Sequence, residues 1–94
     1  MQDVKQSALF PLGRIVITRG VHLAITGDEM LSAMLKHAQG DWGDVCDEDR
    51  RSNEKALLRQ SRLFSAWQAS YGAKFWIITE HDRSCTTILL PEEY

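Results

Sequence analysis

Hydrophobic and polar positions change their spacing several times along the chain, and each change predicts a new element. The first regular run is Arg14–Thr18, which is β-branched and predicts a strand. Its apolar residues do not alternate with polar ones, so we expect a strand that is covered on both faces or that lies near the centre of the sheet. Residues 21–25 are short and ambiguous, and they are interpreted as a single helical turn.

The clearest helical pattern covers residues 27–39. Thr26 and Glu29 have the spacing of a capping box, in which the threonine hydroxyl accepts from the Glu29 amide. Gly40 is well placed to end the helix in the left-handed conformation. Apolar residues then recur at helical spacing, and we expect them to pack on the sheet: Met30, Leu31, Met34, Leu35 and Ala38.

A second helix is predicted from Glu48 to Arg59, with acidic residues first and basic residues later, as the helix dipole favours. Its apolar stripe is thin and lies near its end. We therefore expect a surface helix, anchored by its last turn and by Trp42 and Val45 just before it.

From residue 62 onward the chain becomes β-prone. Residues 74–80 and 85–90 are joined by four polar residues and predict an antiparallel hairpin. Residues 62–70 fit a period of 2 and a period of 3.6 equally well. We favour a strand there because Gly72 supplies a turn into the next run, and a helix stays the alternative.

The predicted order is therefore β–α–α–β–β–β, an α+β fold of two layers, with an antiparallel sheet and the helices on one of its faces. The 94 residues suffice for one hydrophobic core. We expect a single domain over residues 1–94, in which residues 1–13 form an irregular lead-in.

Composition narrows the classes of function. The net charge of −2 and the absence of a basic stripe make nucleic acid an unlikely partner and favour protein or small-molecule partners. No run approaches the roughly 18 apolar residues of a membrane span, and no secretory signal is visible at the N-terminus. We therefore expect a cytoplasmic protein whose two cysteines, Cys46 and Cys85, stay reduced and unlinked.

Candidate catalytic groups are few. The three histidines have no zinc-site spacing, so no metal and no cofactor are predicted. His81, Asp82 and Arg83 form a turn with catalytic residue types, but neighbouring turn residues point apart, whereas a nucleophile and its base must converge. Cys46 precedes a helix start, where a thiolate is favoured, yet acidic neighbours oppose it. The roles of His81 and Cys46 stay open.

The strongest candidate binding surface is the acidic connection before the second helix. A helix start needs one cap, yet this stretch carries several carboxylates around a tryptophan. That tryptophan is either a wedge on the core or an exposed anchor for a partner, and binding requires the second. The candidate binding residues are Asp41, Trp42, Asp44, Asp47 and Arg50. The aromatic residues could instead stack nucleic-acid bases, but core positions are the commoner role.

The strings GDWGDVCDEDRRSNEKALLRQSRLFSAW and KFWIITEHDRSCTTILLPEEY resemble a family of short bacterial proteins carried on plasmids and other mobile elements. The family is called plasmid-related protein, and some members are called a type I restriction subunit. The matching segments are Arg14–Thr18, Gly40–Gly43, Asp49–Leu57, Arg62–Trp67 and Trp76–Tyr94, with Trp67 where a tyrosine is common. The resemblance implies a bacterial mobile-element setting and no defined activity. No methyltransferase cofactor loop supports the restriction label.

These observations together predict a non-enzymatic protein-interaction module of a bacterial mobile element, acting on host defence, replication or transfer. Its partner is an unidentified protein, and a homo-oligomer stays open. The alternative is a small hydrolase or toxin-like nuclease that uses the turn of His81, Asp82 and Arg83.

Overall fold

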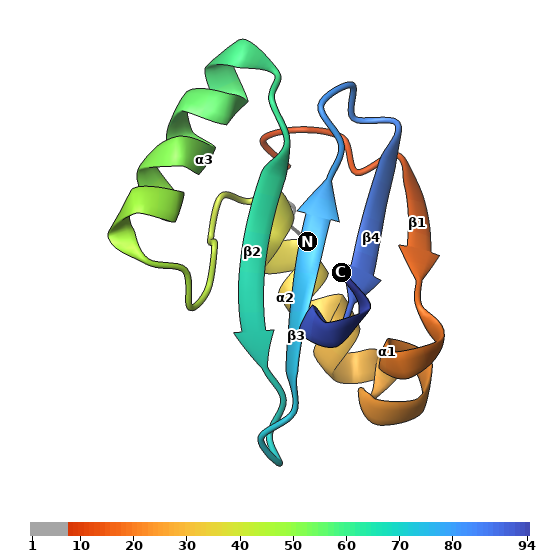
Figure 1. Ribbon diagram of the computed structural model, residues 1–94. Coiled ribbons are helices and arrows are strands. Elements are labelled where there is room, and N and C mark those ends of the chain that lie inside the picture. The colour runs from red at the N-terminus through yellow and green to blue at the C-terminus, as the bar shows by residue number, and fades with distance from the viewer. Residues whose placement is uncertain (1–7) are drawn as a thin grey trace, which may run out of the picture.

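A computed structural model of the protein describes residues 8–94, and the first part of the predicted lead-in, residues 1–7, lies outside the described residues. The described part is a small α+β fold with a four-stranded mixed sheet (Figure 1). Residues 8–13 are irregular, as predicted. In chain order the elements are β1 (Arg14–Ile17), α1 (Arg19–Ala24), α2 (Gly27–Ala38), α3 (Asp47–Arg59), β2 (Leu63–Gln68), β3 (Lys74–Thr79), β4 (Cys85–Leu89) and the 3-10 helix η1 (Pro91–Glu93).

The strand order is β1-β4-β3-β2, with β2, β3 and β4 antiparallel and β1 parallel to β4. The hairpin of β3 and β4 and the strand over residues 62–70 are confirmed. The prediction of a purely antiparallel sheet with β1 near its centre is wrong. β1 is an edge strand that pairs with the last strand, β4, and the crossover through α2 behind the sheet allows this pairing to be parallel.

Helix α2 lies behind the sheet in Figure 1 and covers one of its faces. Its buried residues are Ala33, His37 and Ala38, and Met30 and Met34 pack on the same core. The prediction that Leu31 and Leu35 also pack on the sheet is wrong, because they are 52% and 53% exposed. The helix is rotated relative to the predicted face, and a histidine occupies the buried stripe.

The predicted ends of α2 are confirmed. The Thr26 hydroxyl accepts from the Glu29 amide at 3.2 Å, and Gly40 follows the helix with a φ of +84°. The Glu29 carboxylate accepts from the Thr26 hydroxyl at 3.3 Å and from the Ser70 amide at 2.7 Å. The cap therefore also ties α2 to the turn between β2 and β3.

The outer edge of β2 is closed by the segment that leads into α3 and by α3 itself. The Ala66 amide donates to the Trp42 carbonyl at 3.2 Å, and the Ala66 carbonyl accepts from the Asp44 amide at 2.8 Å. Two residues before Ala66 on β2, the Asn53 side chain forms hydrogen bonds with both backbone groups of Phe64, at 2.7 and 3.1 Å. Side chain and loop thus take the place of a fifth strand along β2.

His37 is the centre of a buried chain of hydrogen bonds across α2 and the sheet. The Thr86 hydroxyl donates to the Leu12 carbonyl at 2.7 Å, so Thr79 must donate to Thr86 at 2.7 Å. The Thr79 oxygen, 2.9 Å from Nε2, therefore accepts from the Nε2–H of His37. Nδ1 then accepts from the Ser65 hydroxyl at 2.7 Å. Each group in the chain is satisfied when the imidazole is neutral.

Among residues 8–94, no helix is both long enough and apolar enough to cross a membrane.

Candidate functional site

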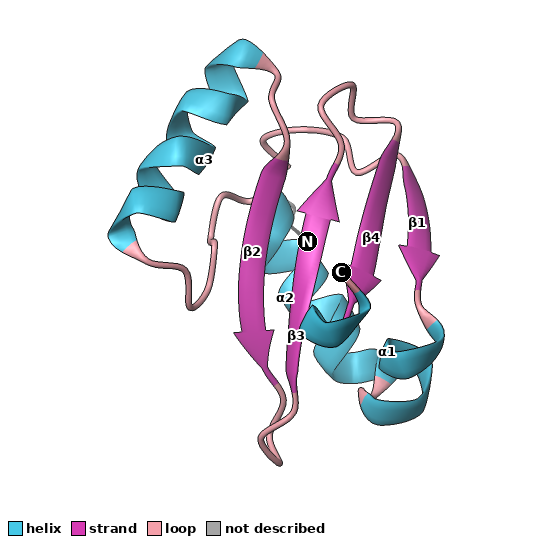
Figure 2. Ribbon diagram, viewed as in Figure 1, coloured by secondary structure: helices cyan, strands magenta, loops and turns pink. Residues whose placement is uncertain are grey.

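The face of the sheet opposite α2 carries aromatic side chains, and within residues 8–94 no α-helix covers it. Side chains alternate along a strand, so Phe75 and Ile77 point into the core beneath α2 while Trp76 and Ile78 point to the opposite face. Figure 2 shows that α2 lies behind the sheet, whereas the short η1 lies in front of it. We call this second face, on which Trp76 and Ile78 lie, the open face.

Trp76 is the centre of an aromatic ridge on the open face. Its ring lies 5.1 Å from that of Phe64 and 5.8 Å from that of Tyr94, both in edge-to-face geometry. Such pairs hold each other's orientation. Tyr94 is 71% exposed at the end of the chain, and it is fixed from its other side by Arg62.

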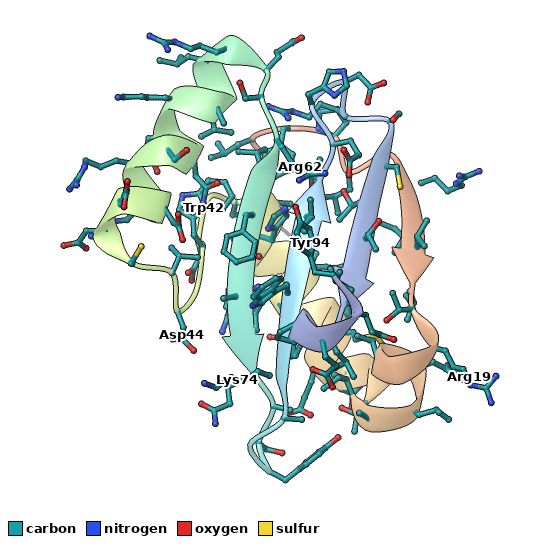
Figure 3. All side chains as sticks on the ribbon, viewed as in Figure 1. Arg19, Trp42, Asp44, Arg62, Lys74 and Tyr94 are labelled. Atoms are coloured by element: carbon teal, nitrogen blue, oxygen red, sulfur yellow. The ribbon has the colours of Figure 1, made fainter. Side chains whose placement is uncertain are left out.

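Arg62 donates a hydrogen bond of 2.9 Å to the Tyr94 hydroxyl, and its Nε lies 3.6 Å from the Glu80 carboxylate. Figure 3 shows Arg62 and Tyr94 next to each other in front of the sheet. The hydrogen bond to Tyr94, followed by the charge of Glu80, raises the pKa of Arg62 above its ordinary value. The ridge is therefore bordered by a permanently charged guanidinium.

Two shallow hollows flank Trp76. One has a volume of about 370 Å³, and the other of about 440 Å³. The first is lined by Asp49, Arg62, Phe64, Trp76, Ile78 and Tyr94. The second is lined by Asp44, Ala66, Trp67, Gln68, Lys74, Trp76 and Pro91. Each hollow combines an apolar wall with one acidic and one basic side chain.

Trp42 is not the exposed anchor that the binding hypothesis required. It is 3% exposed, its indole Nε1 donates to the Glu54 carboxylate at 3.1 Å, and its ring packs against Phe10 and His37. That expectation is wrong because the segment of Trp42 pairs with the edge of β2, which turns the indole toward the core. Trp42 instead packs the connection onto the core, as the alternative interpretation of a wedge expects.

The other four predicted binding residues do not form one surface in the structure. Asp41 accepts from the Gly43 amide at 3.0 Å and shapes the turn. Asp47 pairs with Arg50 on the exposed first turn of α3. Asp44 lies at the tip of the connection, opposite Lys74, and lines the larger hollow (Figure 3). Of the five, Asp44 is the one that reaches the open face.

The turn of His81, Asp82 and Arg83 is held by its own polar groups. Asp82 accepts from the amide and the hydroxyl of Ser84, at 3.0 and 2.6 Å, and these bonds lower the pKa of its carboxyl. Arg83 donates to the carbonyls of Ser61, Glu80 and Ala56 at 2.6, 3.1 and 3.1 Å. Asp82 and Arg83 thus have structural partners, and His81 is exposed.

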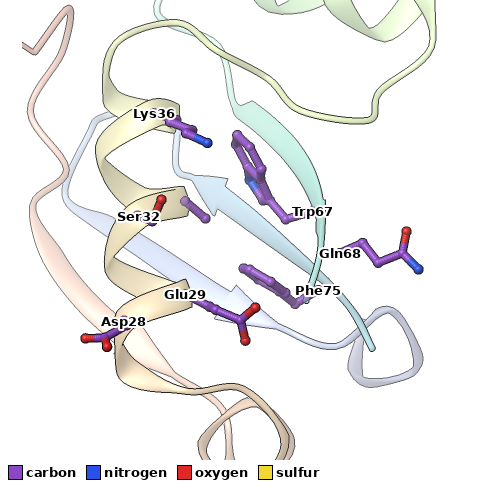
Figure 4. Close-up of a pocket in the computed structure, with 8 residues that line it drawn as sticks. Asp28, Glu29, Ser32, Lys36, Trp67, Gln68 and Phe75 are labelled. Carbon is purple, nitrogen blue, oxygen red and sulfur yellow. The ribbon is translucent and has the colours of Figure 1, made fainter. Parts of the chain in front are cut away.

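Cys46 is an exposed free thiol at the start of α3, and Cys85 is a half-buried free thiol on β4. Within residues 8–94, no three His, Cys, Asp or Glu side chains come together as a metal site. A third hollow of about 240 Å³ lies between α2 and β2, where Lys36 and Glu29 face Trp67 and Phe75 (Figure 4). In this third hollow Glu29 is already engaged by Thr26 and Ser70.

Sequence reasoning considered Phe64, Trp76 and Tyr94 only among the aromatic residues that could stack nucleic-acid bases, and it favoured core positions for them. The signal was present, because the strands over residues 62–70 and 74–80 carry large apolar residues at both odd and even positions. With the helices on one face of the sheet, half of those residues had to lie on the other face.

Comparisons with protein-family models, with curated proteins and with solved structures found no match for this chain.

Proposed function

We propose that the protein is a non-catalytic binding module whose open face, centred on Trp76, docks a protein partner. The observation that carries the proposal is the aromatic ridge of Phe64, Trp76 and Tyr94, which lies on a sheet face without a helical layer. Tryptophan, tyrosine and arginine contribute most of the binding energy at protein interfaces, and here they adjoin each other on a rigid sheet.

The charges around the ridge favour a polypeptide over a nucleic acid. Arg62 shares its hollow with Asp49, and Lys74 shares the other with Asp44. A phosphate backbone would meet one carboxylate for every basic group, which opposes binding. A peptide that presents apolar side chains between residues of both charges fits both hollows.

The resemblance to plasmid-related proteins supports a setting for this activity. We propose that the module acts in the cytoplasm of a bacterium that carries the mobile element, on a host or plasmid protein of defence, replication or transfer. A hydrolase or nuclease at His81 is not proposed, because Asp82 and Arg83 are engaged in holding their turn.

Site-specific photo-crosslinking in that bacterium tests the proposal. A photoreactive residue replaces Gln68, which is exposed and lines both the larger hollow and the third one, and in a matched control it replaces Ser32, which is exposed on α2 and lines the third hollow alone. We expect Gln68 to crosslink to a defined protein and Ser32 not to. The crosslink should be lost when Trp76→Ala is added, because this substitution removes the central side chain of the ridge that contacts the partner.

Crosslinking of the Gln68 position to nucleic acid would refute a protein partner. Equal crosslinking from both positions, or none from Gln68 with the fold intact by circular dichroism, would remove the open face as the binding site.

A further inference from the structure

The two edges of the sheet differ in whether their outward backbone groups are satisfied. On β2 the outward groups belong to Phe64, Ala66 and Gln68, and those of Phe64 and Ala66 find partners in Asn53 and in the segment 42–44. Among residues 8–94, no segment lies beyond β1 (Figure 1). Exposed edges of this kind pair with another strand unless the protein blocks them.

The outward groups of β1 can be assigned from the bonds on its inner side. The Arg14 amide donates to Ser84 and the Thr18 amide donates to Ile88, both on the side of β4. Backbone groups alternate in direction along a strand, so those of Ile15 and Ile17 point outward. The side chains of these two residues are 37% and 44% exposed, on the face that α2 covers.

We propose that a second copy of the chain pairs with this edge, β1 against β1 in antiparallel orientation about a two-fold axis at Val16. The second copy must present the same outward residues. Ile15 of each copy therefore lies opposite Ile17 of the other. Each of these pairs exchanges two hydrogen bonds, four in total. The isologous contact joins the two sheets into one.

Apolar complementarity supports this register. On the α2 face the four isoleucines of the two copies adjoin each other, and in a single chain Ile15 and Ile17 are 37% and 44% exposed. A second copy covers an apolar surface that a single chain leaves in water.

Charge complementarity on the opposite face supports it independently. The register places Arg14 of one copy beside Thr18 of the other, whose backbone is still extended at φ −72° and ψ 162°. The Thr18 hydroxyl donates to the Glu93 carboxylate at 2.5 Å, so that carboxylate lies next to the incoming guanidinium. The two-fold axis forms this Arg14–Glu93 contact twice.

The alternative register, centred on Ile15, is less favourable. It would pair Ile17 with Gly13, which has a φ of +67° and lies outside the strand. The bonds of that outer pair would be lost, and Arg14 would face Val16 in place of Glu93.

Sedimentation velocity on the full chain tests the proposal. We expect a dimer, and we expect Ile15→Lys/Ile17→Lys and Ile15→Glu/Ile17→Glu each to be monomeric, since like charges meet across the axis. An equimolar mixture of the two variants should give a heterodimer. The control Leu58→Lys, at a position 88% exposed on α3, should leave the dimer unchanged. A wild-type monomer at the highest soluble concentration would overturn the proposal.

Disulfide trapping tests the register with a nearly unchanged strand. In a Cys46→Ser/Cys85→Ser background, Val16→Cys lies opposite itself at the non-hydrogen-bonded pair, where Cα atoms approach to about 4.5 Å and a disulfide can form. We expect Val16→Cys to crosslink at least tenfold faster than Ile15→Cys. Faster crosslinking of Ile15→Cys, or equal rates for both, would overturn the two-fold at Val16.

Discussion

The side chain of Asn53 pairs with the backbone of Phe64 as a neighbouring strand would. Its Nδ2 donates to the Phe64 carbonyl at 2.7 Å, and its Oδ1 accepts from the Phe64 amide at 3.1 Å. Asn53 is 3% exposed, so water does not compete for these bonds. This contact explains how α3, whose apolar stripe is thin, is held against the sheet.

We predict that Asn53→Ala lowers the free energy of unfolding by about 1–3 kcal/mol, because two shielded backbone groups of Phe64 lose their partners. Asn53→Asp should cost more at neutral pH, since a carboxylate oxygen would face the Phe64 carbonyl. Urea denaturation measures both. Ser52→Ala, an exposed neighbour on the same helix, serves as the control and should change stability by less than about 0.5 kcal/mol. Equal stability of Asn53→Ala and Ser52→Ala would show that water replaces the side chain.

Local signals in the sequence predicted most elements and failed where the outcome depends on distant partners. The Thr26 cap on the Glu29 amide, the left-handed Gly40 and the hairpin of residues 74–90 are set within a few residues, and all three are confirmed. The other half of the capping box differs, because the Glu29 carboxylate accepts from the Thr26 hydroxyl and not from its amide. The place of β1 at the sheet edge depends on pairing with residues some seventy positions later, which no local pattern contains.

The candidate site was predicted less well than the fold, for a related reason. Trp42 stands among aspartates, which indicated an exposed residue, but the backbone pairing with Ala66 turns its ring into the core. No local pattern marks His37 as a buried residue, yet Ser65 and Thr79 satisfy it inside the protein. In both cases the partner that decides burial comes from another element.

A second prediction concerns Gly43, whose φ is +69° and whose missing Cβ would lie 2.1 Å from the Ala66 carbonyl oxygen. Gly43→Ala should destabilise the protein strongly, because both the strained backbone and the collision with a backbone atom oppose it. Gly27→Ala is the matched control: nothing lies within 4 Å of its added methyl group, and alanine is the better helix former. We expect Gly27→Ala to raise the melting temperature and Gly43→Ala to lower it. A similar effect of both variants would argue against the pairing of the connection with β2.

A third prediction separates a structural from a catalytic role of the His81 turn. Arg83 donates to three backbone carbonyls, and its guanidinium lies 5.6 Å from the centre of the Phe10 ring. Burial lowers its pKa from the ordinary value, but the group remains charged. Arg83→Met should therefore cost about 2–3 kcal/mol in urea denaturation. His81→Ala should leave stability and the biological phenotype unchanged. Loss of phenotype in a fully folded His81→Ala protein would reinstate the hydrolase alternative.

The last prediction is an acid-sensitive core centred on His37. Burial lowers the pKa of His37 from 6.5 to about 4, so the folded protein keeps the ring neutral where the unfolded chain protonates it. The contribution of His37 to the free energy of unfolding is fully present above pH 6.5 and decreases as the pH drops toward 4. The total decrease is about 3 kcal/mol. His37→Gln should be less stable than the wild type at pH 7, and this difference should narrow toward pH 4.

Urea denaturation at several pH values between 7 and 4 measures the narrowing, and His22→Gln, which changes an exposed histidine, controls for the titration of the rest of the chain. Nitrogen NMR of the imidazole adds a direct test, because the hydroxyl chain from Leu12 to Thr79 requires the proton on Nε2. We expect an unprotonated Nδ1 at pH 7. A proton on Nδ1, or a constant stability difference between wild type and His37→Gln over the whole range, would contradict the buried neutral chain. A narrowing for His37→Gln and not for His22→Gln would place the acid sensitivity at this one ring, since protonation turns Nδ1 into a donor and leaves the Ser65 hydroxyl proton without its acceptor.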